Sequence, residues 1–151
     1  MASIYARRRG EGKPLILIHG FPMNQNVWND FGDRFVNTCQ VITPDLPGFG
    51  KSPTLRSPFS IDLIADQVIH FLVEQEIVNG TVIGHSLGGY VALAMINRRP
   101  DLFTALGLFH STAYADSAEK RESRTKVIEF VEKNGALPFV TNFVSPLFAN
   151  P

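Results

Sequence analysis

One segment, residues 81–89, constrains this chain more than any other. Its apolar run Thr81–Ile83 stops abruptly, and Gly84, Ser86 and Gly88 then form the pattern Gly-x-Ser-x-Gly. A helix-compatible segment starts at once, so the pattern occupies a turn between a strand and a helix. Such a turn presents a serine hydroxyl above a helix N-terminus and holds the serine backbone in a sparsely populated conformation. We therefore identify Ser86 as a candidate nucleophile.

The two glycines of the pattern have a steric reason. The strand and helix backbones pass close to the turn, so Gly84 and Gly88 leave no room for a Cβ atom. A bare Gly-x-Ser-x-Gly pattern occurs by chance in roughly one chain of this length in twenty. A plain glycine-rich turn with a capping serine is the alternative interpretation, so further segments have to decide between the two.

Composition narrows the class of protein. The 151 residues are 44% hydrophobic and 19% charged, which is typical of a globular domain with a substantial core. The 14 basic and 14 acidic residues balance, so we expect no nucleic-acid partner and no membrane partner. The single cysteine, Cys39, excludes a disulfide framework and favours a cytoplasmic location. No metal cluster or phosphate-binding loop is evident, so we expect no metal and no cofactor.

The chain alternates between short apolar runs and amphipathic segments. Continuous apolar runs are typical of strands buried on both faces of a parallel sheet. Strands are predicted at Ile4–Arg9, Leu15–Ile18, Gln40–Thr43, Thr81–Ile83 and Ala105–Phe109. Helices are predicted at Asn24–Val36, in the segment that follows an N-cap at Ser60, at Ser86–Arg99 and at Ser117–Asn134. This order predicts an α/β fold with a doubly wound, mostly parallel sheet. Residues 1–115 form its core, and residues 116–151 form a separate helical segment in which Gly135 ends the first helix.

The carboxyl ends of the strands bring three groups together, because catalytic groups gather there in a doubly wound sheet. The first is the Ser86 hydroxyl, which needs a base because serine is a weak nucleophile. The second is the Leu87 N–H at the start of a helix, directed at a developing oxyanion. The third is the turn His19–Pro22, in which Gly20 lets the Phe21 N–H act as a second donor. Each donor of this kind lowers a barrier by roughly 3 kcal/mol.

Three motifs occur in order along the chain, at His19–Pro22, Asp45–Ser52 and Gly84–Gly89. Together they resemble the α/β-hydrolase superfamily, in its branch of cap-bearing serine esterases, lactonases and small-molecule hydrolases. The resemblance covers residues 1–115, and three linked motifs make it specific.

The resemblance implies a role for each of these residues. Ser86 is the nucleophile, and the Phe21 and Leu87 amides form the oxyanion hole. A helical cap follows the strand that ends near Phe109, and residues 116–151 are expected to be its beginning. The family carries its acid on a later strand and its histidine after the last strand. Because the chain ends inside the cap, we expect the N-terminal portion of a hydrolase, either a fragment, a truncated product or one part of a split enzyme, without those two groups.

None of the four histidines is an obvious base. His110 is the one that follows Ser86, and it is a candidate stand-in base or a wall of the pocket. His19 is expected to brace the oxyanion turn, and the side chain of His85 is expected to diverge from Ser86. His70 lies on a solvent-facing helix surface.

Three acids have a suitable chain position or lie at a suitable edge of the sheet. Asp101 lies between Ser86 and His110, but the intervening helix carries it about 20 Å away, to the opposite edge, at ~1.5 Å per residue. Asp45 is at the correct edge, in a loop whose composition favours bonding to its own backbone. Asp116 would approach from the base of the cap.

These observations predict a serine hydrolase that attacks a small ester, lactone or related acyl substrate through a Ser86 acyl-enzyme. Two alternatives stay open: a binding module or truncated hydrolase without activity, and an acyl transferase on the same fold. The chain alone is expected to show little or no turnover. Its expected partners are the acyl substrate and either a missing C-terminal portion or a second copy, paired along the open edge of the strand that ends at Phe109.

Overall fold

Five strands form one mixed sheet in the structure, a computed structural model that describes residues 4–55, 59–144 and 146. The strands are β1 (Ala6–Arg9), β2 (Lys13–Ile18), β3 (Cys39–Pro44), β4 (Gly80–His85) and β5 (Phe103–Phe109). Their order across the sheet is β1-β3-β2-β4-β5. β1 pairs antiparallel to β3, and the other neighbouring pairs are parallel. The predicted mostly parallel α/β sheet is therefore confirmed.

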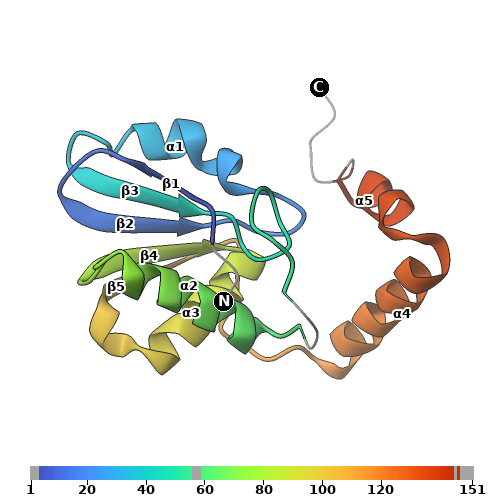
Figure 1. Cartoon of the computed structure of the whole chain (residues 1–151). Helices are drawn as coiled ribbons and strands as arrows, with labels where there is room; N and C mark the ends of the chain where they lie inside the picture. Colours follow the sequence, from blue (N-terminus) through green and yellow to red (C-terminus); the bar gives the residue numbers. More distant parts are fainter. Residues whose placement is uncertain (1–3, 56–58, 145, 147–151) are drawn as a thin grey trace. The chain divides into compact units, whose positions relative to one another are not determined.

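Helices cover both faces of this sheet (Figure 1). The elements are α2 (Ile61–Glu74) and α3 (Leu87–Arg98) on one face, η1 (Gln25–Trp28) and α1 (Asn29–Asp33) on the other, and η2 (Pro100–Leu102) before β5. The larger core lies under α2 and α3 and contains the fully buried Ile16, Ile18 and Val82. The smaller core lies under α1 and contains Leu17 and Trp28. Alternate residues of β2 enter opposite cores, which is why this strand is a continuous apolar run.

The strand register brings three chain segments to one edge of the sheet. Ile18 at the end of β2 lies opposite Gly84 in β4, and His85 lies opposite Phe109 at the end of β5. Because these strands are parallel, the segments that follow them emerge side by side. The ends of β2, β4 and β5 therefore meet at one edge of the sheet.

The helix predicted at Asn24–Val36 is wrong in extent. The segment forms the short η1 and then the five-residue α1, and turns follow. In a 3₁₀ helix residues three apart lie on one side, so Gln25 and Trp28 are both buried against the sheet. Gly32 adds poor helix propensity. Burial of these two side chains therefore decides the local conformation where the intrinsic preference is weak.

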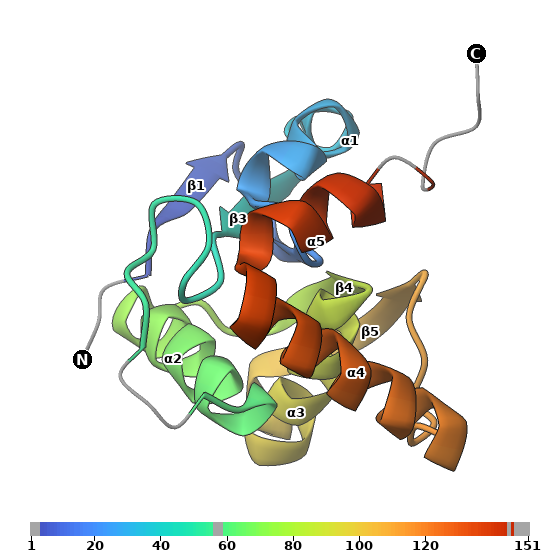
Figure 2. The ribbon, with the colours of Figure 1, turned by 90° about the vertical axis from the view of Figure 1, so that its right-hand side faces the viewer.

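The chain divides into two compact units, Met1–Ala113 and Tyr114–Pro151. The second unit contains α4 (Ala118–Asn134) and α5 (Ala136–Val144), which follow one another in Figure 2. Gly135 separates them with φ +80°, and its N–H donates to the Val131 carbonyl oxygen, so the predicted glycine at the helix end is confirmed. The identification of residues 116–151 as the start of a cap stays a prediction. No helix in the described ranges combines the length and apolar character needed to cross a membrane.

Candidate active site

Ser86 occupies the turn between β4 and α3. Its φ is +51° and its ψ is −114°, a conformation that residues other than glycine rarely adopt. Strain of this kind costs on the order of 1–3 kcal/mol and persists where the surrounding structure imposes it. The strained serine backbone predicted from the sequence is therefore confirmed.

The glycines on either side of Ser86 have no room for a side chain. A Cβ on Gly84 would lie 2.2 Å from the Gly88 carbonyl oxygen, and a Cβ on Gly88 would lie 2.5 Å from the Ile18 carbonyl oxygen. Both neighbours are backbone atoms, which cannot rotate away. The predicted steric reason for the two glycines is confirmed. Their lack of a side chain lets the first turn of α3 pack against the end of β2.

The turn that begins at His19 lies directly against the serine. A Cβ on Gly20 would lie 3.0 Å from the Ser86 Cβ and 2.8 Å from His85 Nδ1. Only a residue without a side chain can approach Ser86 so closely. Phe21, the predicted oxyanion donor, is the next residue of this turn.

The second predicted oxyanion donor directly follows Ser86 in the sequence. Leu87 is the first residue of α3. Backbone N–H groups at this position carry the partial positive charge of the helix N-terminus, which favours a developing anion. Phe21 follows the glycine that lies against Ser86, and Leu87 follows Ser86 itself. Their role as an oxyanion hole stays a prediction.

His19 braces the turn from within the core. Its ring is fully buried, and Nε2 accepts a hydrogen bond from the Leu46 N–H at 2.9 Å. Nδ1 therefore carries the proton and donates to the Gly20 carbonyl oxygen at 2.9 Å. Burial lowers the pKa of His19 below its ordinary value, which keeps the ring in this neutral form. One side chain thus joins the turn after β2 to the loop after β3, which is the geometry that the predicted bracing role requires.

The loop after β3 is held by one buried carboxylate. Asp45 Oδ1 accepts from the Gln25 N–H at 2.7 Å, and Oδ2 accepts from the Lys51 N–H at 2.8 Å. Gly50 makes room for this carboxylate, because a Cβ there would lie 2.2 Å from Oδ2. The Ser52 hydroxyl closes the loop by donating to the Asp45 carbonyl oxygen at 2.7 Å. Asp45 is therefore committed to backbone groups, in agreement with the composition of its loop.

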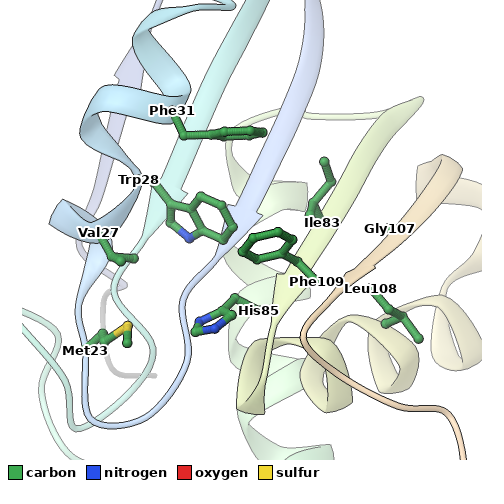
Figure 3. Close-up of a pocket in the computed structure, with 9 residues that line it drawn as sticks. All are labelled: Met23, Val27, Trp28, Phe31, Ile83, His85, Gly107, Leu108 and Phe109. Atoms are coloured by element: carbon green, nitrogen blue, oxygen red, sulfur yellow. The ribbon is translucent and has the colours of Figure 1, made fainter. Parts of the chain in front are cut away.

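A hollow of about 460 Å³ opens on the face of the sheet that carries α1. Figure 3 shows the rings of Trp28, His85 and Phe109 gathered around it, and the centroids of the last two are 5.7 Å apart. Trp28 is only 5% exposed, and its Nε1–H has no hydrogen-bond partner among the described residues. His85 is a wall of this hollow, and a supporting role for it beside Ser86 stays a prediction.

His110 follows β5 in a left-handed conformation, with φ +47°. Its ring lies edge-on to Phe109, with centroids 4.7 Å apart, and 6.3 Å from the ring of His85. No hydrogen bond joins the Ser86 hydroxyl to a histidine ring within the described part of the chain. The geometry therefore gives His110 packing contacts, and its role as a stand-in base stays a prediction.

The other two candidate acids already serve basic side chains. Asp101 pairs with Arg99 at 2.7 Å, and the hydrogen bond from Arg99 lowers the pKa of Asp101. Asp116, in the second unit, pairs with Arg124, whose hydrogen bond lowers the pKa of Asp116. Neither carboxylate is singled out as the acid of the site. Across the described ranges, no group of three or more His, Cys, Asp or Glu side chains is arranged to hold a metal ion.

Ser111 is a contact of the site to which the sequence assigns no role. Its hydroxyl donates to the Ser86 carbonyl oxygen at 2.8 Å, across 25 residues of chain. A lone serine after a strand carries no local signal, so only the pairing of β4 with β5 reveals it.

The buried His19 and the half-buried His85 predict how stability depends on pH. Burial is the main cause that lowers the pKa of His19 and of His85 below 6.5. The unfolded chain therefore binds more protons than the folded chain below about pH 6.5. The contribution of these histidines to the free energy of unfolding is fully present above that pH and is lost as the pH drops toward their folded pKa values. Each histidine changes the free energy of unfolding by at most about 1.4 kcal/mol per pH unit. We expect the urea concentration at the unfolding midpoint to decrease when the pH is lowered from 7.5 to 5.5.

Two variants separate this effect from general acid sensitivity. His85→Phe keeps an aromatic ring in the hollow but cannot titrate, so its urea midpoint should fall less on acidification. Phe31→Leu changes a side chain of the same hollow that carries no titratable group, so it should retain the wild-type pH dependence. A wild-type midpoint that stays constant over this range would contradict the prediction.

The fold and the turn at Ser86 can now be compared with known proteins. A family described as "alpha/beta hydrolase fold" matches residues 13–130. The chain belongs to this family. The resemblance predicted from three sequence motifs is thereby confirmed.

The relatives of this alpha/beta hydrolase include enzymes of known reaction. Pimeloyl-[acyl-carrier protein] methyl ester esterase from Neisseria meningitidis is 37% identical over 107 residues, which are 71% of this chain and 40% of that protein. A thermophilic esterase from Thermogutta terrifontis matches with a TM-score of 0.86 and 30% identity, over 95% of this chain and 53% of that one. An enzyme that degrades N-acyl homoserine lactones matches with a TM-score of 0.69 and 29% identity, over 72% and 42% of the two chains.

The matched region is a part of each relative. The chain spans 29% of an uncharacterized protein from Mycobacterium tuberculosis, 35% identical over 100 residues, and 40% of the Neisseria meningitidis esterase. The family and the relatives together support a hydrolase. They leave open its nucleophile, its substrate and the activity of this chain.

Proposed function

We propose that this chain carries the acylation half of a serine hydrolase, with Ser86 as the nucleophile. One observation carries the proposal. Ser86 is held at φ +51° on the turn between β4 and α3, so close to Gly20 that a Cβ there would lie 3.0 Å from the Ser86 Cβ. A strained serine between a helix N-terminus and a second backbone turn is suited to attack a carbonyl and to stabilise the charge that develops.

The proposed reaction begins with attack of Ser86 Oγ on the carbonyl carbon of an ester or lactone, while a base takes the hydroxyl proton. The resulting oxyanion accepts hydrogen bonds from the Phe21 and Leu87 N–H groups. The carbon–oxygen bond to the leaving group then breaks, and the leaving alkoxide takes a proton. Water attacks the acyl-enzyme in the same way, which releases a carboxylic acid and restores Ser86.

We further propose that the base and the acid come from outside residues 1–151. The support is negative and geometric: within the described ranges no histidine ring bonds to the Ser86 hydroxyl, and Asp45 is bonded to backbone groups. His110 is the stand-in if the chain itself holds a base. The expected cytoplasmic location likewise remains a proposal.

The substrate class follows from the relatives. One similar protein is a methyl ester esterase that acts on a pimeloyl group, and another degrades N-acyl homoserine lactones. The first name describes a carboxylic ester and the second a lactone. We therefore propose a small ester, lactone or related acyl compound as the substrate.

The proposal predicts slow but selective reaction of Ser86 with a fluorophosphonate. An oxyanion hole without a complete set of partners retains about 10³–10⁴-fold catalysis over water. We expect intact mass spectrometry to show one adduct per chain, and exogenous imidazole to speed its formation about tenfold by acting as the missing base. Ser86→Ala should lower labelling at least 100-fold, whereas Ser117→Ala, at the cap of α4, should not change it.

Three outcomes would change this conclusion. Absence of labelling in the presence of imidazole would favour a binding module that keeps the fold without the chemistry. Equal labelling of wild type and Ser86→Ala would assign the reaction to another residue. Ester turnover without imidazole, lost in both Ser86→Ala and His110→Ala, would show that the chain holds its own base at His110.

An acyl transferase is the second candidate, because a structure described as a putative acyltransferase matches with a TM-score of 0.67 and 26% identity. Transfer differs from hydrolysis only in the acceptor that attacks the acyl-enzyme. Identifying the product after adding an alcohol or a thiol to the acylated chain distinguishes the two. An acid product supports the hydrolase, and a new ester or thioester supports the transferase.

A further inference from the structure

The last residue of β5 and the two residues that follow it hold both polar backbone groups of Ser86. The Ser86 N–H donates to the Phe109 carbonyl oxygen at 3.0 Å. The Ser111 hydroxyl donates to the Ser86 carbonyl oxygen at 2.8 Å. Two consecutive contacts from one three-residue segment thus bracket the peptide units on either side of the strained serine.

His110 makes this arrangement possible. It lies between the two contacting residues, and its φ of +47° turns the chain so that the Phe109 carbonyl and the Ser111 hydroxyl both face Ser86. A left-handed histidine is itself strained, and such residues persist only where their surroundings impose them. Two strained residues, Ser86 and His110, therefore lie opposite one another, and the two hydrogen bonds join Ser86 to the neighbours of His110.

Ser111 is also fixed by its packing. A Cβ on Gly89 would lie 2.2 Å from the Ser111 hydroxyl oxygen and 2.4 Å from the Ser111 Cβ. The side chain of Ser111 therefore fills the space that Gly89 leaves open on the first turn of α3. Gly89 also donates its N–H to the Ser86 carbonyl oxygen at 3.0 Å, so this oxygen accepts two hydrogen bonds from different segments.

The direction of the Ser86 carbonyl has a consequence for the proposed oxyanion hole. The Ser86 carbonyl and the Leu87 N–H belong to one planar trans peptide group, so they point in opposite directions and rotate together. Any group that fixes the carbonyl oxygen on one side fixes the N–H on the other. The two donors on the Ser86 oxygen thereby aim the Leu87 N–H.

We propose that Ser111 is a positioning residue, which holds the Ser86–Leu87 peptide plane and through it aims the Leu87 N–H at the reacting carbonyl oxygen. The clamp on the backbone stands on geometry alone, and its effect on reaction rests on the proposed function. Ser111 does not touch the substrate in this role. Its removal therefore lowers the rate of acylation without changing how tightly a reagent binds.

The test uses the full chain with Ser111→Ala and Ser111→Cys. The cysteine variant keeps a side chain of the same branching, with a somewhat larger sulfur atom, but donates only weakly. Both variants should therefore behave alike if the hydrogen bond matters. Hydrogen–deuterium exchange of the Ser86 and Gly89 amides should accelerate about fivefold, the factor that corresponds to one hydrogen bond of about 1 kcal/mol. Thr104→Ala, at the opposite end of β5, is the matched control and should leave this exchange unchanged.

The second readout is fluorophosphonate labelling of Ser86 with imidazole present. Both variants should lower the maximal rate of labelling about tenfold, a factor of about 1.4 kcal/mol, while the reagent concentration for half-maximal rate stays constant. Unchanged amide exchange in both variants would overturn the clamp, and accelerated exchange with an unchanged labelling rate would overturn the positioning role. Rescue by cysteine alone would assign the effect to packing and also overturn the proposal. If the wild type is not labelled at all, the proposed function fails, and amide exchange alone decides whether the clamp exists.

Discussion

Gly88→Ala is expected to destabilise the protein by about 3 kcal/mol or to prevent folding, although alanine is the better helix former. Replacing glycine by alanine inside a helix ordinarily stabilises it by about 1 kcal/mol. Here the new Cβ would lie 2.5 Å from the Ile18 carbonyl oxygen and 2.6 Å from the His19 carbonyl oxygen. Overpacking against rigid neighbours typically costs about 1–3 kcal/mol and occasionally more. Both contacts are backbone atoms of the β2 end, so the clash outweighs the gain in propensity.

The same displacement should also remove the reactivity of Ser86. If α3 retreats from β2, the Leu87 N–H and the Gly20 turn no longer flank the serine. Urea unfolding followed by circular dichroism measures the stability, and fluorophosphonate labelling measures the reactivity. Gly107→Ala is the matched control, since its Cβ would meet the Ile83 side chain at 3.1 Å, which can move; we expect a change below about 1 kcal/mol. A Gly88→Ala chain as stable as wild type would show that α3 and β2 are not in contact.

Leu108→Lys is expected to weaken self-association of the chain at least tenfold, by about 1.4 kcal/mol. In the described part of the sheet, β5 pairs with β4 alone and is an edge strand. Leu106 and Leu108 are 38% and 37% exposed, and Phe109 is 50% exposed. The strand contains no charged residue and no proline, which are the usual features that prevent edge strands from pairing with another chain. We therefore propose that this edge pairs with a further strand, from a second copy or from another portion of a hydrolase.

Sedimentation over a range of protein concentrations measures this association. The wild type should shift to larger species as the concentration rises, and a lysine on the β5 edge should keep the chain monomeric. Val78→Lys is the control, because Val78 is 50% exposed but lies outside the strands, and it should associate as the wild type does. A wild type that is monomeric at all concentrations, with cooperative unfolding, would contradict pairing of this edge with a second copy.

Much of the site was predictable because its signals are local. A glycine on each side of Ser86 implies close backbone approach, and the Cβ distances at Gly84 and Gly88 bear this out. The alternation of apolar runs and amphipathic segments predicts a mostly parallel sheet, in which strand ends meet. The meeting of the His19 turn with Ser86 then follows from topology. Each of these inferences needs only a short stretch of sequence and a steric or topological rule.

Other features were not predictable because they depend on contacts between distant segments. The helix expected at Asn24–Val36 shortens because Gln25 and Trp28 must both face the sheet. Asp45 could be placed in its own loop, yet its bond to the Gln25 N–H joins segments 20 residues apart. The tautomer of His19 depends on the Leu46 N–H, which no local pattern indicates.

The sequence by itself determined the family, the alternation of strands and helices in the core and the identity of the strained serine, because glycine spacing and apolar periodicity act over a few residues. Only the tertiary structure decided what holds that serine in place. The Phe109 carbonyl and the Ser111 hydroxyl reach Ser86 because β4 and β5 pair in one particular register. A hydrogen bond across 25 residues depends on that register and on the left-handed turn at His110, and the sequence around Ser86 predicts neither of them.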